Sequence, residues 1–261
     1  MNNTWITFLN GILKMPGAKI NRESFLRKTF KDLPEEKIRM CISDSPVRVL
    51  PPALIDRVAS SIINSHAAKV TAISTVSGIP GGLALLATIP ADMANYYYHI
   101  VSVGQKLGYL YGFPDMVDNK GKLTPDGEIM LTAFIGVMNK VQIANELIRK
   151  IATEMAKRLS EETARRIAGN ILSKQLISQA IETVATKLGT QITSKSAGRG
   201  ISKAIPIVSG IICGGLTYAT FKPQSKRLLK TLQSTAEVSR KLIPEPIEVP
   251  ALTLDVKASS D

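Results

Sequence analysis

Few residues in this 261-residue chain could support catalysis or metal binding, because it has only two histidines and two cysteines. The cysteines, Cys41 and Cys213, lie far apart and lack the spacing of metal ligands, and their scarcity is typical of a reducing compartment. Asp92 and His99 are seven residues apart, so on a helix they share one face and could form an acid–base or metal pair. We favour simpler roles, with Asp92 as a helix N-cap and His99 packed or interfacial.

The sequence contains no nucleophile elbow, phosphate loop, dinucleotide-binding glycine pattern or zinc-protease motif. The turn near Asp118 lacks the spacing of a calcium loop, because Met116 occupies the first ligand position. The sequence therefore predicts a non-enzymatic protein, and it indicates no cofactor and no small-molecule substrate. An enzyme that uses Asp92 and His99 is the least favoured alternative.

The charge is strongly basic, with 33 Lys and Arg against 21 Asp and Glu and a net charge of +12. The excess is concentrated between Lys195 and Lys241, where Glu237 is the single acid. We expect this region to meet an anionic membrane surface or an acidic protein partner. Nucleic acid is less favoured, because aromatic residues are not interleaved with the basic ones. The candidate contacts are Lys195, Arg199, Lys203, Lys222, Lys226, Arg227 and Lys230.

Two charge-free, glycine-rich segments stand out, Val70–Ala91 and Ala204–Phe221. Each contains a glycine, a short apolar stretch and then Gly-Gly-Leu, and each also contains Ile-Pro. Their length approaches that of a membrane span, but their Gly, Pro, Ser and Thr content makes insertion marginal. We expect two helical hairpins that are either packed in a soluble core, which we favour, or in contact with a membrane.

The remaining pattern is helical. Amphipathic spacing and capping residues predict helices over 4–14, 22–31, from 34, from 52 to about 69, over 93–112, from 125 to about 159, through 167–192 and over 224–241. We therefore predict an all-α fold with one multi-helix domain centred on the two hairpins. Residues 1–20 form a short amphipathic segment, residues 21–241 the helical domain, and residues 242–261 a Pro-rich extended or mobile tail.

The stretch from Ile73 to Gly112 resembles the EcsC family of bacterial proteins, and the similarity extends over about residues 20 to 235. The residues that carry it are Gly78, Pro80, Gly81, Gly82, Pro90, Asp92, Tyr96, Tyr98, Gln105, Lys106, Tyr109, Tyr111, Gly112, Pro206, Gly214 and Gly215. The resemblance implies a bacterial source and a single helical domain. The family is named after a gene in an ABC-transporter operon, but no established activity or catalytic residues come with it.

The N-terminus has no basic residue before Lys14 and no long apolar run, so it does not read as a signal peptide. We expect a cytoplasmic protein that lies at, or is partly embedded in, the inner face of the cytoplasmic membrane, where it could support envelope or transport machinery. A soluble helical interaction module and a membrane-perturbing, toxin-like protein are the alternatives.

Overall fold

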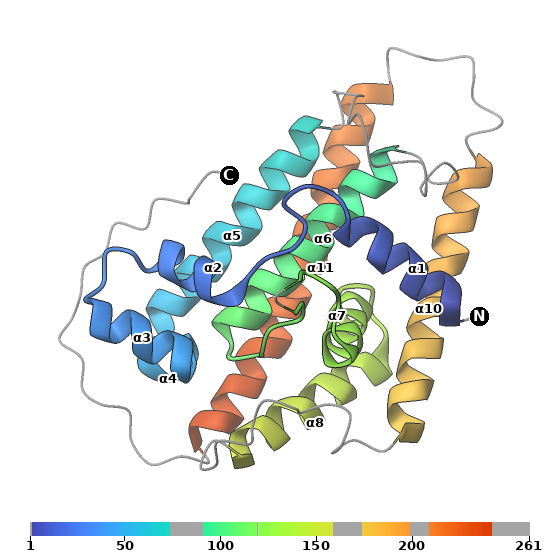
Figure 1. The fold of residues 1–261 in the computed structure, drawn as a ribbon. Helices are drawn as coiled ribbons and strands as arrows, with labels where there is room; N and C mark the ends of the chain where they lie inside the picture. Colours follow the sequence, from blue (N-terminus) through green and yellow to red (C-terminus); the bar gives the residue numbers. More distant parts are fainter. Residues whose placement is uncertain (1, 74–90, 119, 159–173, 199–208, 242–261) are drawn as a thin grey trace.

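The computed structural model describes residues 2–73, 91–118, 120–158, 174–198 and 209–241 (Figure 1). The all-α fold is confirmed, because these residues form helices joined by loops. Their β-structure is limited to an isolated bridge between Val117 and Leu123. The helices are α1 (Asn2–Leu13), α2 (Arg22–Thr29), α3 (Glu35–Ser43), α4 (Pro46–Val49), α5 (Pro52–Ile73), α6 (Ala91–Leu110), α7 (Pro125–Met138), α8 (Gln142–Arg158), α10 (Lys174–Gly198) and α11 (Ser209–Lys241).

Two predicted helix starts are confirmed by their caps. The Asn21 side chain accepts a hydrogen bond from the Ser24 backbone N–H at 2.8 Å and begins α2. The Thr124 hydroxyl accepts one from the Gly127 N–H at 2.9 Å and begins α7, with Pro125 as its first residue. Short-range capping chemistry therefore marks the first residue of each of these helices.

The single long helix predicted from 125 to about 159 is wrong, because the chain breaks between α7 and α8. Lys140 adopts a left-handed φ of 60°, and the Val141 N–H bonds back to the Gly136 carbonyl at 2.9 Å. This closure ends α7 in the way that glycine usually does. The apolar periodicity could not reveal the break, because Val141 and Ala144 are buried on the far side of it.

The separation predicted at Pro223 is also wrong, since α11 continues through this residue from Ser209 to Lys241. Proline has no N–H to offer the carbonyl four residues earlier, that of Ala219. Both Ala219 and Pro223 lie on the exposed side of α11, so water can satisfy that carbonyl. The described part of the second glycine-rich segment, residues 209–221, is thus the N-terminal part of a long helix. Residues 204–208 lie outside the described residues.

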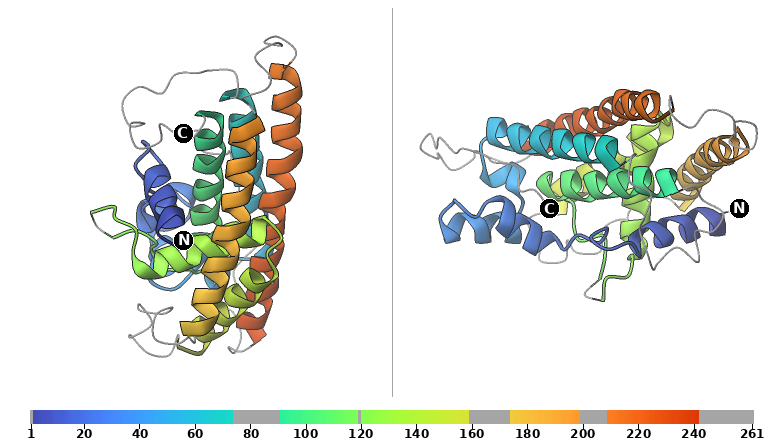
Figure 2. Two further views of the ribbon diagram at one scale, coloured as in Figure 1. Left: turned by 90° about the vertical axis from the view of Figure 1, so that its right-hand side faces the viewer. Right: turned by 90° about the horizontal axis from the view of Figure 1, so that it is seen from above.

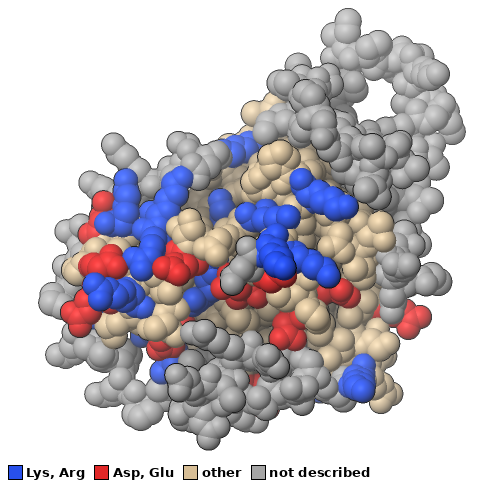
Figure 3. Space-filling view, in the orientation of Figure 1, with Lys and Arg blue, Asp and Glu red and all other residues tan. Residues whose placement is uncertain are grey.

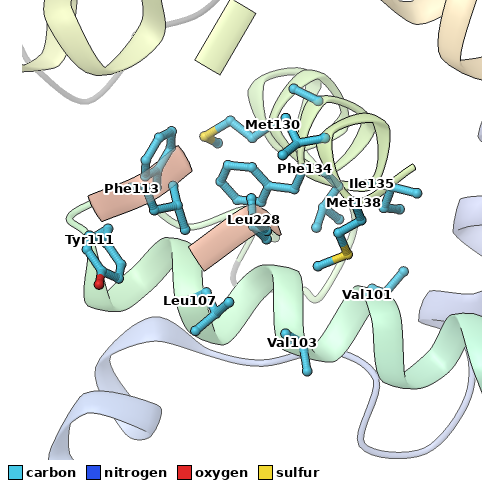
Figure 4. Packing of buried hydrophobic residues seen from close by; sticks show 14 of the residues in the cluster. Val101, Val103, Leu107, Tyr111, Phe113, Met130, Phe134, Ile135, Met138 and Leu228 are labelled. Atoms are coloured by element: carbon cyan, nitrogen blue, oxygen red, sulfur yellow. The ribbon is translucent and has the colours of Figure 1, made fainter. Parts of the chain in front are cut away.

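Helix α6 lies at the centre of the molecule, with α11 on one side and α1 on the other in both views of Figure 2. Buried side chains of α6 and α7 face each other in the core, with Leu228 of α11 packed between them (Figure 4). The rings of Phe113 and Phe134 meet edge-on, with centroids 5.0 Å apart. Most of the described residues that carry the EcsC resemblance lie on α6, at this central position.

Candidate functional site

The two histidines of the chain meet inside the helical bundle. His66 lies on α5 and His99 on α6, and their Nδ1 atoms are 2.9 Å apart. Both rings are buried, with 7% of His66 and 2% of His99 exposed. On the α11 side, the Phe221 ring lies edge-on to His99 at a centroid distance of 6.5 Å. The pair therefore joins α5 to α6 at a point that α11 covers.

The hydrogen-bond partners indicate which ring nitrogens carry protons. The Lys106 ammonium lies 3.1 Å from Nε2 of His66, and an ammonium can only donate. His66 then carries its proton on Nδ1 and donates it to Nδ1 of His99, so the proton of His99 resides on Nε2. That Nε2 atom is buried and has no hydrogen-bond partner among the described residues. A directed chain thus runs from Lys106 through His66 to His99.

The surroundings of the pair favour neutral rings. Burial lowers the pKa of both histidines below the ordinary value of 6.5, and the positive charges of Lys69 and Lys106 lower it further. The neighbouring His99 ring also lowers the pKa of His66. At neutral pH the site therefore holds two uncharged imidazoles that share one hydrogen bond.

Of the packed and interfacial positions that the sequence favoured for His99, the structure shows the packed one, with His66 as the hydrogen-bond partner. Helix α6 begins at Ala91, so Asp92 lies one residue inside it and not at the N-cap position predicted for it. The position of the Asp92 side chain lies outside the described residues. His66 was missed from sequence because nothing in the spacing of two residues 33 positions apart indicates contact.

Two residues of the resemblance, Gln105 and Tyr109, bind the N-terminal chain to α6. The Gln105 amide accepts from the Ile20 N–H at 3.1 Å and donates to the Ala18 carbonyl at 2.8 Å. The Tyr109 hydroxyl donates to the Ile20 carbonyl at 3.0 Å. Because these side chains satisfy backbone groups in the connection between α1 and α2, their role is structural.

The other tyrosines of the resemblance also serve packing. The Tyr96 hydroxyl hydrogen-bonds Gln224 on α11. The Tyr111 hydroxyl donates to the Asp56 carboxylate on α5 at 3.0 Å. Tyr98 is half-buried, and a Cβ added to Gly17, whose φ is +76°, would lie 2.9 Å from its hydroxyl. These contacts hold α6 against three other parts of the chain.

Gly112 ends the helical turn after α6 in a left-handed conformation with φ of +89°. A Cβ at this position would lie 2.9 Å from Cβ of Ser45, so both the backbone angle and the space require glycine. Several other predicted positions lie outside the described residues: Gly78, Pro80, Gly81, Gly82, Pro90, Arg199, Lys203 and Pro206. Gly214 and Gly215 lie within α11 and Lys195 within α10, where the side chains are not described.

A second candidate site is the exposed side of α11. Lys226 and Lys230 are exposed and Lys222 is half-exposed, and the three lie one turn apart along the helix. One turn before them, Tyr218 is 41% exposed, and the Lys222 ammonium lies 2.9 Å from its hydroxyl and 5.3 Å from its ring centroid. This basic row is defined as Tyr218, Lys222, Lys226 and Lys230.

Arg227 was predicted as an anionic-surface contact, but the structure gives it a different role. Its Nη1 donates to the Met138 carbonyl at 2.7 Å, at the C-terminus of α7. The positive guanidinium suits the negative end of the α7 dipole. Arg227 therefore joins α11 to α7. Its charge is directed inward, whereas Lys226 and Lys230 are exposed.

The basic row differs from the surface that carries α2 and α3. On that surface Lys and Arg lie among Asp and Glu (Figure 3), and Arg27 makes ion pairs with Glu23 and Glu35 at 2.9 Å and 2.8 Å. Helix α11, by contrast, contains six basic residues and one acid, Glu237. Both views of Figure 2 place α11 on the opposite side of the molecule from α1.

The described residues contain neither a membrane-spanning helix nor a metal-binding cluster. Among these helices, none combines the length and apolar character needed to cross a bilayer. Within the same residues, no group of three or more His, Cys, Asp or Glu side chains is placed to hold a metal ion. Cys41 is buried in α3, and burial raises the pKa of its thiol to about 12.

No family model, no curated protein and no solved structure matches the chain. The resemblance to the EcsC family therefore stays a prediction.

Proposed function

We propose that this chain is a non-enzymatic helical protein that associates peripherally with an anionic membrane surface, the cytoplasmic face of the cytoplasmic membrane. The basic row on α11 is the observation that carries the proposal. Its lysines are separated from each other by one helical turn, so their ammonium groups can reach one plane. Each lysine held near an anionic leaflet contributes about 1 kcal/mol of binding free energy.

Tyr218 supports a lipid surface as the ligand. Tyrosine favours the boundary between headgroups and acyl chains, because its ring is apolar and its hydroxyl is polar. Among the described residues, Tyr218 is the one large hydrophobic residue that is exposed. It precedes the lysines on the same side of α11. An acidic protein partner would use the same charges, but it offers no comparable reason for an exposed aromatic ring at the end of the row.

The test is co-sedimentation of the full chain with phosphatidylcholine vesicles that contain or lack phosphatidylserine. We expect binding to the anionic vesicles alone, with release by high salt because the lysine charges are exposed. The triple variant K222Q/K226Q/K230Q should bind at least tenfold more weakly, since a loss of about 1.4 kcal/mol is already tenfold.

The matched control removes the same charge elsewhere. The variant K14Q/K28Q/K31Q replaces three exposed lysines that lie just after α1, on α2 and just after α2, and it should keep most of the binding. Equal losses in the two variants would mean that net charge, and not the basic row, drives binding. No binding of the native chain at low salt would reject a membrane role and leave the acidic protein partner. A requirement for detergent to release the chain would indicate insertion.

A further inference from the structure

We infer that the His66–His99 pair is an acid-released clasp, which holds α5 against α6 while both rings are neutral. The two helices follow each other in the described chain and lie side by side. His66 is seven residues from the end of α5 at Ile73, and His99 is eight residues from the start of α6 at Ala91. The clasp thus lies about 11 to 12 Å from both facing helix ends.

The clasp depends on the number of protons. A hydrogen bond between two Nδ1 atoms 2.9 Å apart needs one proton between them. The first proton can go to Nε2 of His66, which removes the acceptor that faces Lys106 of α6, or to Nδ1 of His99, which removes the acceptor of the bond between the rings. With both protons taken up, two N–H groups stand head to head. Each step replaces an attraction with a repulsion.

The neighbouring charges strengthen this response. From α5, Lys69 acts on both rings, and from α6, Lys106 does the same; both are cationic. Tyr98 of α6 meets His99 edge-on at 5.0 Å, and α11 presents the Phe221 ring. Among the described side chains, these are the groups that act on the pair, and none of them is a carboxylate that would stabilise an imidazolium. Protonation therefore drives α5 and α6 apart at this level.

Trp5 reaches α6 through Phe8, whose ring meets Tyr97 edge-on at 5.0 Å, so a wide opening of α6 would also reach Trp5. The single tryptophan stacks on Phe8, and its Nε1 donates to Thr132 of α7 at 3.0 Å. Trp5 emission therefore reports the main core, and amide exchange in α5 and α6 reports the clasp.

The experiment is hydrogen–deuterium exchange of the native chain between pH 7 and pH 4.5, corrected for intrinsic rates, with Trp5 emission recorded in parallel. We expect at least a tenfold loss of protection over residues 59–70 and 93–103, while residues 129–138 of α7 and Trp5 emission stay unchanged. If α5 and α6 keep their protection until Trp5 emission changes, there is no clasp. Lipid is absent throughout, so the outcome is separate from that of membrane binding.

The matched variant H66L/H99F replaces both rings with apolar side chains and should keep its protection over the same pH range. Opening of this variant at the same pH as the native chain would overturn the inference. Should the variant fail to fold, nitrogen-15 NMR of the native imidazoles gives an independent test, because the chain has no other histidines. We expect one Nδ1–H and one Nε2–H tautomer, both neutral at pH 6. Two Nε2–H tautomers, or an ordinary titration near pH 6.5 in the folded chain, would contradict the clasp.

Discussion

The indole N–H of Trp5 donates to the Thr132 hydroxyl at 3.0 Å, which joins α1 to the middle of α7 across 127 positions of sequence. Both residues are buried, with Thr132 fully inaccessible. Trp5, Phe8, Leu9 and Ile12 all belong to the main hydrophobic cluster, so the N-terminal helix is packed into the same core as α6 and α7. The stability of that core can be tested at this bond.

The substitution T132V should destabilise the fold by about 1–3 kcal/mol, because it leaves a buried N–H without an acceptor while the shape of the side chain is kept. Urea unfolding followed by circular dichroism measures the change. T183V is the control, since Thr183 is exposed on α10 and should change stability by less than about 0.5 kcal/mol. Equal effects would show that helix propensity, and not the buried bond, explains the loss.

Replacement of Arg227 should affect stability, and replacement of its neighbour should affect binding. R227M removes a charged donor from the Met138 carbonyl and should cost about 1.5–3 kcal/mol. K226M removes an exposed lysine and should leave the unfolding free energy nearly unchanged. Thermal unfolding and vesicle binding, measured on both variants, separate the two roles. A fully stable R227M would show that the carbonyl contact is not needed.

Two glycines should respond in opposite ways to alanine. A Cβ at Gly127 would lie 2.0 Å from the Met116 carbonyl oxygen, a backbone atom that cannot move aside alone, so G127A should be destabilised by about 1–3 kcal/mol. At Gly104 the nearest atom would be 3.7 Å away, in ordinary contact. G104A should therefore gain up to about 1 kcal/mol from helix propensity. Denaturant midpoints of the two variants check the sign of each change.

The histidine pair predicts how global stability depends on pH. Burial lowers the pKa of both rings, that of His99 to about 4, so in the window from 6.5 downwards the unfolded chain binds more protons than the folded one. The contribution is complete above about pH 6.5 and falls as the pH drops toward 4, by about 1–3 kcal/mol. Urea unfolding of the native chain and of H66L/H99F at each pH measures this contribution, as the difference between their unfolding free energies. A difference that is constant between pH 7 and pH 4.5 would contradict the lowered pKa values.

Local chemistry was readable from the sequence wherever a few neighbouring residues decide the outcome. The caps at Asn21 and Thr124 and the all-α class follow from side chains that bond within one turn and from apolar spacing. The same local rules failed at Lys140 and Pro223. There, a break and a continuation are set by what packs on either side of the helix.

The sequence by itself determined the scarcity of catalytic groups and the concentration of basic charge near the C-terminus, because composition carries these properties. Only the tertiary structure decided which charges face outward. Lys226 and Arg227 are adjacent in sequence, yet one is exposed and the other reaches Met138. It also brought His66 to His99, because a contact across 33 residues depends on how α5 and α6 pack and not on any local propensity.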